Sequence, residues 1–191
     1  MIRITAMVGL GLLLLGGCSD DDGVTSEATA RQAYLGLEKM IDRAMDLGFD
    51  GYNAATSANI PPQTTNGDVG GTLTVSGKVD QGSSSNKEMQ LELALVGYSD
   101  GMNLIYDTGS TRPALNMSLK KIPDGDLTGS LSGTFHVTGD LDGDVVLVLA
   151  IVAKLEPDPA DNTKIRRKPG TIVVSGTATS VWGTYQVDLT L

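Results

Sequence analysis

Apolar side chains recur at spacings of three and four between residues 26 and 47, which predicts one amphipathic helix. Ser26 is suited to the N-cap and Gly48 to the C-terminal stop, so we expect the helix to run from about Ser26 to Leu47. Its apolar stripe is expected to pack on the sheet of the same domain, and the alternative is a helix that binds a partner or a membrane surface. The stripe consists of Ala30, Ala33, Tyr34, Leu37, Met40, Ile41, Ala44 and Leu47.

From Val69 onward the period changes to two, which predicts half-buried β-strands. The clearest strand runs from Leu127 to Leu141: its odd positions are apolar or glycine, and its even positions are Thr, Ser, His or Asp. Asp-Gly dipeptides, typical of tight turns, separate several of the runs. About eight strands result, at residues 69–79, 89–95, 102–106, 115–119, 127–141, 145–155, 171–178 and 181–191.

The predicted fold is therefore mainly β, with one N-terminal helix packed on a curled antiparallel sheet of about eight strands, half-barrel or barrel-like. Gly129, Gly133 and Gly139 fall on the inner face of their strand, where the missing side chains allow a sheet to bend. Residues 145–155 are apolar on both faces, so we expect other structure to cover this strand. Residues 50–68 and 156–170 are rich in turn formers or in Pro and charge, and both are expected to be loops.

The chain opens with a short cationic segment that ends at Arg3, followed by an apolar run from Ile4 to Leu15. This layout is typical of an export signal and is too short for a membrane-spanning helix. The residues Leu15-Gly16-Gly17-Cys18 come next, and they resemble the lipobox of bacterial lipoproteins. In that family a lipid is attached to the cysteine thiol and the preceding peptide is removed.

The resemblance implies a signal peptide over residues 1–17 and lipid on Cys18. The polar, acidic residues that follow indicate a lipidated tether over residues 18–25, and the length of the remainder suits a single domain over residues 26–191. The covalent lipid on Cys18 would hold the protein at a membrane, since two or three acyl chains together bind firmly. By analogy with enteric lipoproteins, Ser19 favours the outer membrane over the inner one. We therefore expect a protein of the cell envelope.

Composition narrows the chemistry of the domain. The formal net charge is −9, which argues against nucleic acid as a partner. Cys18 is the only cysteine, so once it is lipidated the chain has no disulfide and no cysteine nucleophile. The chain also has a single histidine, His136, and no recognisable acid or nucleophile stands beside it in the sequence. We predict no enzymatic activity, no catalytic residue, no cofactor and no metal.

Three local features remain as candidates for a site. Asp140, Asp142 and Asp144 resemble the opening of a calcium loop, although a hairpin turn explains them more simply, and calcium binding stays open. The basic cluster of residues 166–168 is expected on a solvated loop, where it could also touch anionic lipid or an acidic partner. Trp182 lies next to a turn and is either part of the core or an exposed aromatic contact.

Two functions are consistent with these patterns. The first is a non-catalytic interaction or structural module anchored in the envelope. The alternative is a carrier of an apolar ligand or lipid, held between helix and curved sheet, because the architecture resembles that of lipoprotein-localisation factors and lipocalins. An integral outer-membrane barrel is a third hypothesis, and the few aromatic residues argue against it.

Overall fold

The computed structural model describes residues 22–80 and 82–191, which form two helices and ten strands. The helices are α1 (Asp22–Leu35) and α2 (Glu38–Ala54). The strands are β1 (Asn59–Asn66), β2 (Gly70–Val79), β3 (Lys87–Gly101), β4 (Leu104–Asp107), β5 (Ala114–Lys120), β6 (Asp126–Gly139), β7 (Gly143–Asp158), β8 (Asp161–Arg167), β9 (Val173–Ser180) and β10 (Gly183–Thr190). The predicted signal peptide and Cys18 lie outside the described residues.

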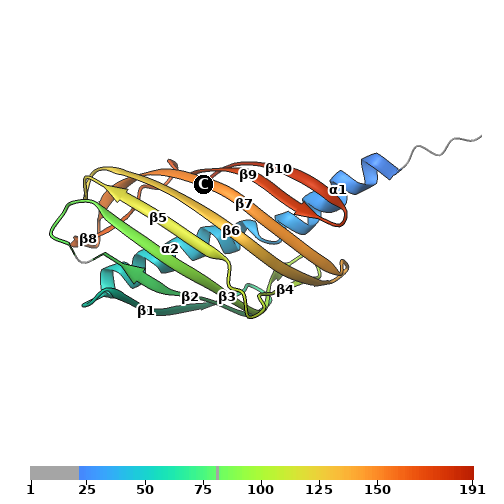
Figure 1. Ribbon diagram of the computed structural model, residues 1–191, viewed down its shortest axis with the longest axis horizontal. Helices are drawn as coiled ribbons and strands as arrows, with labels where there is room; N and C mark the ends of the chain where they lie inside the picture. Colours follow the sequence, from blue (N-terminus) through green and yellow to red (C-terminus); the bar gives the residue numbers. More distant parts are fainter. Residues whose placement is uncertain (1–21, 81) are drawn as a thin grey trace, which may run out of the picture.

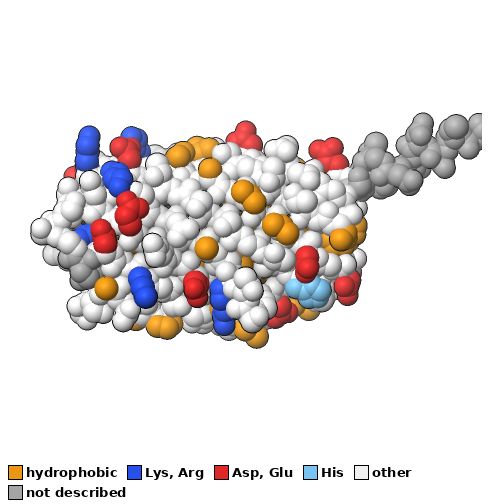
Figure 2. All heavy atoms as spheres, in the orientation of Figure 1, with side chains coloured by type: hydrophobic (Ala, Val, Ile, Leu, Met, Phe, Trp, Pro, Cys, Tyr) orange, Lys and Arg blue, Asp and Glu red, His pale blue; other side chains and the backbone are white. Residues whose placement is uncertain are grey.

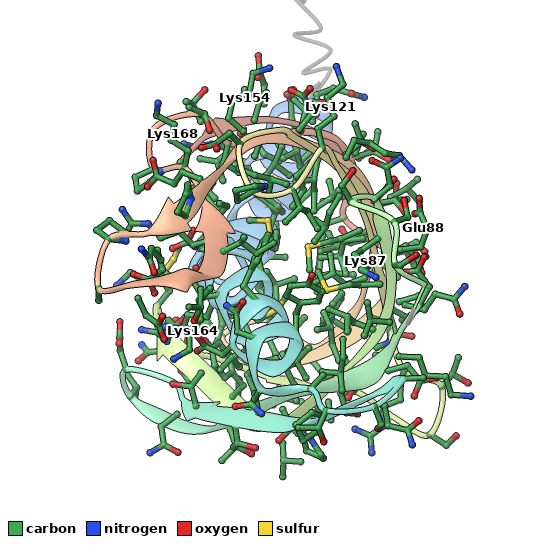
Figure 3. All side chains as sticks on the ribbon, turned by 90° about the vertical axis from the view of Figure 1, so that its left-hand side faces the viewer. Lys87, Glu88, Lys121, Lys154, Lys164 and Lys168 are labelled. Atoms are coloured by element: carbon green, nitrogen blue, oxygen red, sulfur yellow. The ribbon has the colours of Figure 1, made fainter. Side chains whose placement is uncertain are left out.

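The strands form an antiparallel, barrel-like sheet that curls around the helices (Figures 1 and 3). Its order is β1-β2-β3-β4-β6-β7-β9-β10, with β5 between β3 and β6 and β8 paired to the far part of β7. Strands β1 and β10 are the ends of this path, and the helices contact both of them: α1 packs on β10, and α2 packs on β1. The predicted class, a mainly β fold with a helix on a curled antiparallel sheet, is confirmed.

The strand count is ten, not about eight, because two segments expected to be loops are strands. Residues 59–66 form β1, where Pro61 and Pro62 are tolerated because an edge strand does not need all of its N–H groups for pairing. Residues 161–167 form β8, which pairs with the end of β7 in a hairpin. Both segments lack the alternation of buried and exposed apolar residues that identified the other strands.

The predicted single helix is divided in two at Gly36 and Leu37, and its second part continues past the expected stop at Gly48 to Ala54. Tyr106 of β4 causes the break: its buried hydroxyl donates a hydrogen bond of 2.7 Å to the carbonyl oxygen of Ala33. The ring lies so close to Gly36 that a Cβ there would be 2.2 Å from the Tyr106 hydroxyl oxygen. Burial raises the pKa of this hydroxyl, so it remains a donor at neutral pH. Glycine is therefore the residue that allows the chain to pass this side chain.

Ion pairs hold α2 to the sheet along both borders of its solvent-facing side. Toward β3, Arg43 donates to the Asp100 carboxylate at 2.5 Å and to the Tyr98 hydroxyl at 2.8 Å. Toward β8, the buried Arg167 donates to Asp42 at 2.5 Å and to Asp46 at 2.8 Å. Burial alone would lower the pKa of Arg167, but the two carboxylates outweigh it and raise that pKa. Such charge-assisted bonds fix the position of α2 between β3 and β8.

The space between helices and sheet is filled by side chains. Predicted helix residues such as Leu37, Met40 and Ile41 are buried against inward-facing strand residues, including Leu93 and Phe135. Seven of the eight residues of the predicted apolar stripe are buried, and Leu47 is half-buried. Helix α2 approaches the sheet closely at Gly48, where a Cβ would lie 2.7 Å from a methyl group of Leu91. The interior of the barrel-like sheet is therefore filled by the helices and by the inward-facing side chains of the strands.

We expect Gly36→Ala to destabilise the protein by about 1–3 kcal/mol, because the added methyl group collides with the fixed Tyr106 ring. Helix propensity alone would predict the opposite sign, with alanine favoured by about 1 kcal/mol. The free energy of unfolding in urea measures the difference. Gly109→Ala is the matched control, since a Cβ at Gly109 meets nothing within 4 Å. A Gly36→Ala protein as stable as wild type would contradict this account of the break.

Candidate functional site

The outer side of β7 is uncovered, which corrects the expectation that residues 145–155 lie under other structure. Burial alternates along the strand, so Val145, Leu147 and Leu149 enter the core while their neighbours face outward. Val148 is 60% exposed and Val152 is 48% exposed. The error came from treating the valines as core residues on both faces. Within the part of the chain that the structure describes, no segment covers this outer side.

These valines belong to a wider uncharged surface, called here the outer valine face. Cross-strand pairing places four successive outward positions of β7 beside four of β6 and four of β9 (Figure 1). The twelve residues are Thr128, Ser130, Ser132 and Thr134 of β6, Val146, Val148, Ala150 and Val152 of β7, and Val173, Ser175, Thr177 and Thr179 of β9. In Figure 2 separate apolar side chains lie among white atoms, which are backbone and uncoloured side chains, across the middle of the molecule.

A polar side-chain pair between β6 and β7 borders the outer valine face at each end. Near the β6–β7 turn, His136 Nδ1 lies 2.9 Å from the Asp144 carboxylate. At the other end of the two strands, the Lys154 ammonium group pairs with Asp126. That hydrogen bond lowers the pKa of Asp126, so the carboxylate is charged at neutral pH. The face thus consists of small uncharged side chains, with the hydrogen-bonded His136–Asp144 pair at one end and the Lys154–Asp126 ion pair at the other.

The two ends of the molecule differ in what they carry. Helix α1 starts beyond the end of the sheet that holds the β6–β7 and β9–β10 turns, and we call this the tether end (Figure 1). At the opposite end, Lys121, Lys154 and Lys168 point outward around an open hollow of about 820 Å³ (Figure 3). Asp124, Asp126 and Glu156 line the same hollow, so its charge is mixed. Mixed charge gives this hollow little selectivity for an anion or a cation.

The calcium-like residues do not converge. Asp144 pairs with His136, and Asp140 accepts a long bond of 3.4 Å from Asn103. Among the described residues, no group of three or more His, Cys, Asp or Glu side chains is placed to hold a metal ion. The three aspartates belong to the β6–β7 hairpin and its turn.

The basic cluster at residues 166–168 does not lie on the expected solvated loop. Arg166 and Arg167 end β8, and Arg167 is buried against Asp42 and Asp46 of α2. Arg166 pairs with Glu156 at 2.6 Å across the β7–β8 hairpin. Two of the three charges are therefore structural, and the sequence could not indicate this because their partners lie on other elements.

The sequence predicts no acid beside His136, but the structure places Asp144 there. The two residues are symmetric about the predicted turn, so counting back along the hairpin pairs them.

Trp182 is half-buried and packs against the core, with its ring over Gly143, where a Cβ would lie 3.2 Å away. This position agrees with the core interpretation of the tryptophan more than with an exposed contact.

Comparison with known proteins adds no relative: no family model, curated protein or solved structure matches the chain. Among the described helices, none is both long enough and apolar enough to cross a membrane. Function must therefore be argued from the residues of the outer valine face and from the N-terminal segment.

Val148→Lys is expected to change the free energy of unfolding by less than about 0.5 kcal/mol, since the new side chain extends into solvent. Its neighbour Leu149 is 3% exposed, and Leu149→Lys should prevent folding by burying an unpaired charge. Chemical unfolding of both variants provides the comparison. Severe destabilisation by Val148→Lys would mean that part of the same chain covers the outer valine face.

Proposed function

We propose that the protein is a lipoprotein of the bacterial cell envelope, anchored through lipid on Cys18, and that its domain is a non-catalytic interaction or structural module. The observation that supports an interaction or structural module is the uncovered outer side of strand β7. Exposed valines in the middle of a sheet cost solvation free energy, and a row of them along one strand offers apolar surface for contact with a protein. A module of this kind binds through its outer surface.

The anchor is supported by the lipobox-like residues before Cys18 and by the place where α1 begins. Asp22, the first residue of α1, is only four residues from Cys18, so at most about 14 Å of extended chain separates the lipidated residue from the helix. Helix α1 begins beyond the tether end of the sheet. Lipid on Cys18 would therefore bind the tether end to the bilayer and leave the sides of the sheet accessible.

The carrier alternative has less support from the geometry. A carrier needs a concave apolar site, usually of several hundred Å³, between helix and sheet. Here Leu37, Met40 and Met45 occupy that space and are 0% exposed. A ligand could enter only if α2 moved, and the Arg43 and Arg167 pairs oppose such a movement. An outer-surface interaction requires no rearrangement.

We expect Cys18→Ser to abolish incorporation of labelled palmitate and to leave the peptide of residues 1–17 attached, because this family removes that peptide at the lipidated cysteine. No other cysteine can replace Cys18, because the chain has only one. Labelling of the exporting bacterium and the mass of the purified protein measure the two effects. Ser19→Ala is the control that should retain the label. Wild-type protein that carries no label would overturn the lipid anchor.

A further inference from the structure

The outer valine face is self-complementary, and we infer that its partner is a second copy of this chain, packed face to face with the tether ends side by side. This inference rests on the proposed function, because it uses the common membrane anchor. Copies with a formal net charge of −9 repel one another over most of their surface. The twelve uncharged positions of the outer valine face form a surface on which they can approach without that cost.

The arrangement has a two-fold axis parallel to the strands, between β6 and β7. Such an axis places β7 of one copy over β6 of the second at the same level. Larger side chains of one strand then meet smaller or equal ones of the other, which lets two sheets pack closely. The resulting contacts are Val148 on Ser132, Ala150 on Ser130, Val152 on Thr128 and Val146 on Thr134, and each occurs twice.

The same axis matches the polar pairs at both ends of the face. Lys154 of each copy comes over Asp126 of the other, and His136 comes over Asp144. The Lys154–Asp126 ion pair between strands thus gains a second ion pair between copies, and the hydrogen-bonded His136–Asp144 pair gains a second pair of the same kind. The neighbouring strands β5 and β9 also face each other through uncharged residues, and these are Ala114, Asn116, Ser118, Val173, Ser175 and Thr177.

The anchor selects between two possible directions of packing. An axis perpendicular to the strands would also match charges, since it places Lys154 over Asp144, but it sends the two tether ends in opposite directions. Copies held in one bilayer by short tethers have their tether ends on the same side. Confinement to one membrane also raises the effective concentration of each copy near the other, so that even a small interface can hold two copies together.

Single cysteine variants in the lipidated full-length protein test this arrangement, because Cys18 is lipidated and the new thiol is then free. A bifunctional thiol reagent is chosen to span the ~10 Å between packed sheets. With the axis parallel to the strands, Val152→Cys links to itself, and so does Val146→Cys. When two differently tagged copies carry one variant each, Val146→Cys does not link to Val152→Cys.

The control and the disrupting variant complete the design. Val96→Cys lies on β3, outside the outer valine face, is 66% exposed and should give no linked dimer. Adding the exposed Ser132→Arg to Val152→Cys should reduce the dimer at least tenfold, whereas Ser110→Arg, on an exposed loop, should leave it unchanged.

Three outcomes would overturn the inference. Links between Val146→Cys and Val152→Cys alone would reverse the direction of packing. Adducts of Val152→Cys only with other proteins would make the partner a different protein and leave the proposed function standing. If Val152→Cys linked no more than Val96→Cys, a second copy of the chain would be excluded as the partner. The palmitate label on Cys18 would still report separately on the anchor.

Discussion

The fold depends on how one gap is filled. Strand pairing runs from β1 to β10, and the helices lie against both of these strands. Helix α2 therefore replaces the side chains that normally fill the inside of a small barrel and also forms part of its wall. The Arg43 and Arg167 ion pairs fix the helix from both sides, with Arg167 buried and satisfied by two carboxylates. Filling the interior in this way leaves the outer surface for contact with other molecules.

Much of this architecture could be predicted from the sequence because period-two and period-3.6 patterns depend only on which residues face a core. The break at Gly36 could not be predicted, since its cause, Tyr106, lies far along the chain. Strand β8 was hidden for a similar reason: Arg167 looks like a surface residue until Asp42 and Asp46 are beside it. Local pattern identifies a strand by its alternation, and a strand whose two buried residues are Ile165 and Arg167 does not show it.

The candidate site was out of reach for a different reason. Valines on both sides of β7 indicate two apolar surfaces, but they do not indicate whether the same chain covers both. Only the arrangement of all the elements shows that Val148 faces outward in the described structure. The His136–Asp144 pair is the opposite case, because the symmetry of a hairpin about its turn predicts it from residue numbers alone. Contacts within a hairpin are therefore predictable, whereas the absence of a covering layer is not.

The Tyr106 contact has a mechanical consequence. If lipid on Cys18 anchors the protein as proposed, a pull on that lipid would pass along α1 and load its contact with β10. The load reaches Ala33, where the Tyr106 hydroxyl ties the helix to β4 in the interior of the sheet. Because Gly36 and Leu37 interrupt the helix directly after this tie, tension need not pass on into α2. With the proposed anchor, Tyr106 would take up such a force before it reached α2 and the core of the domain.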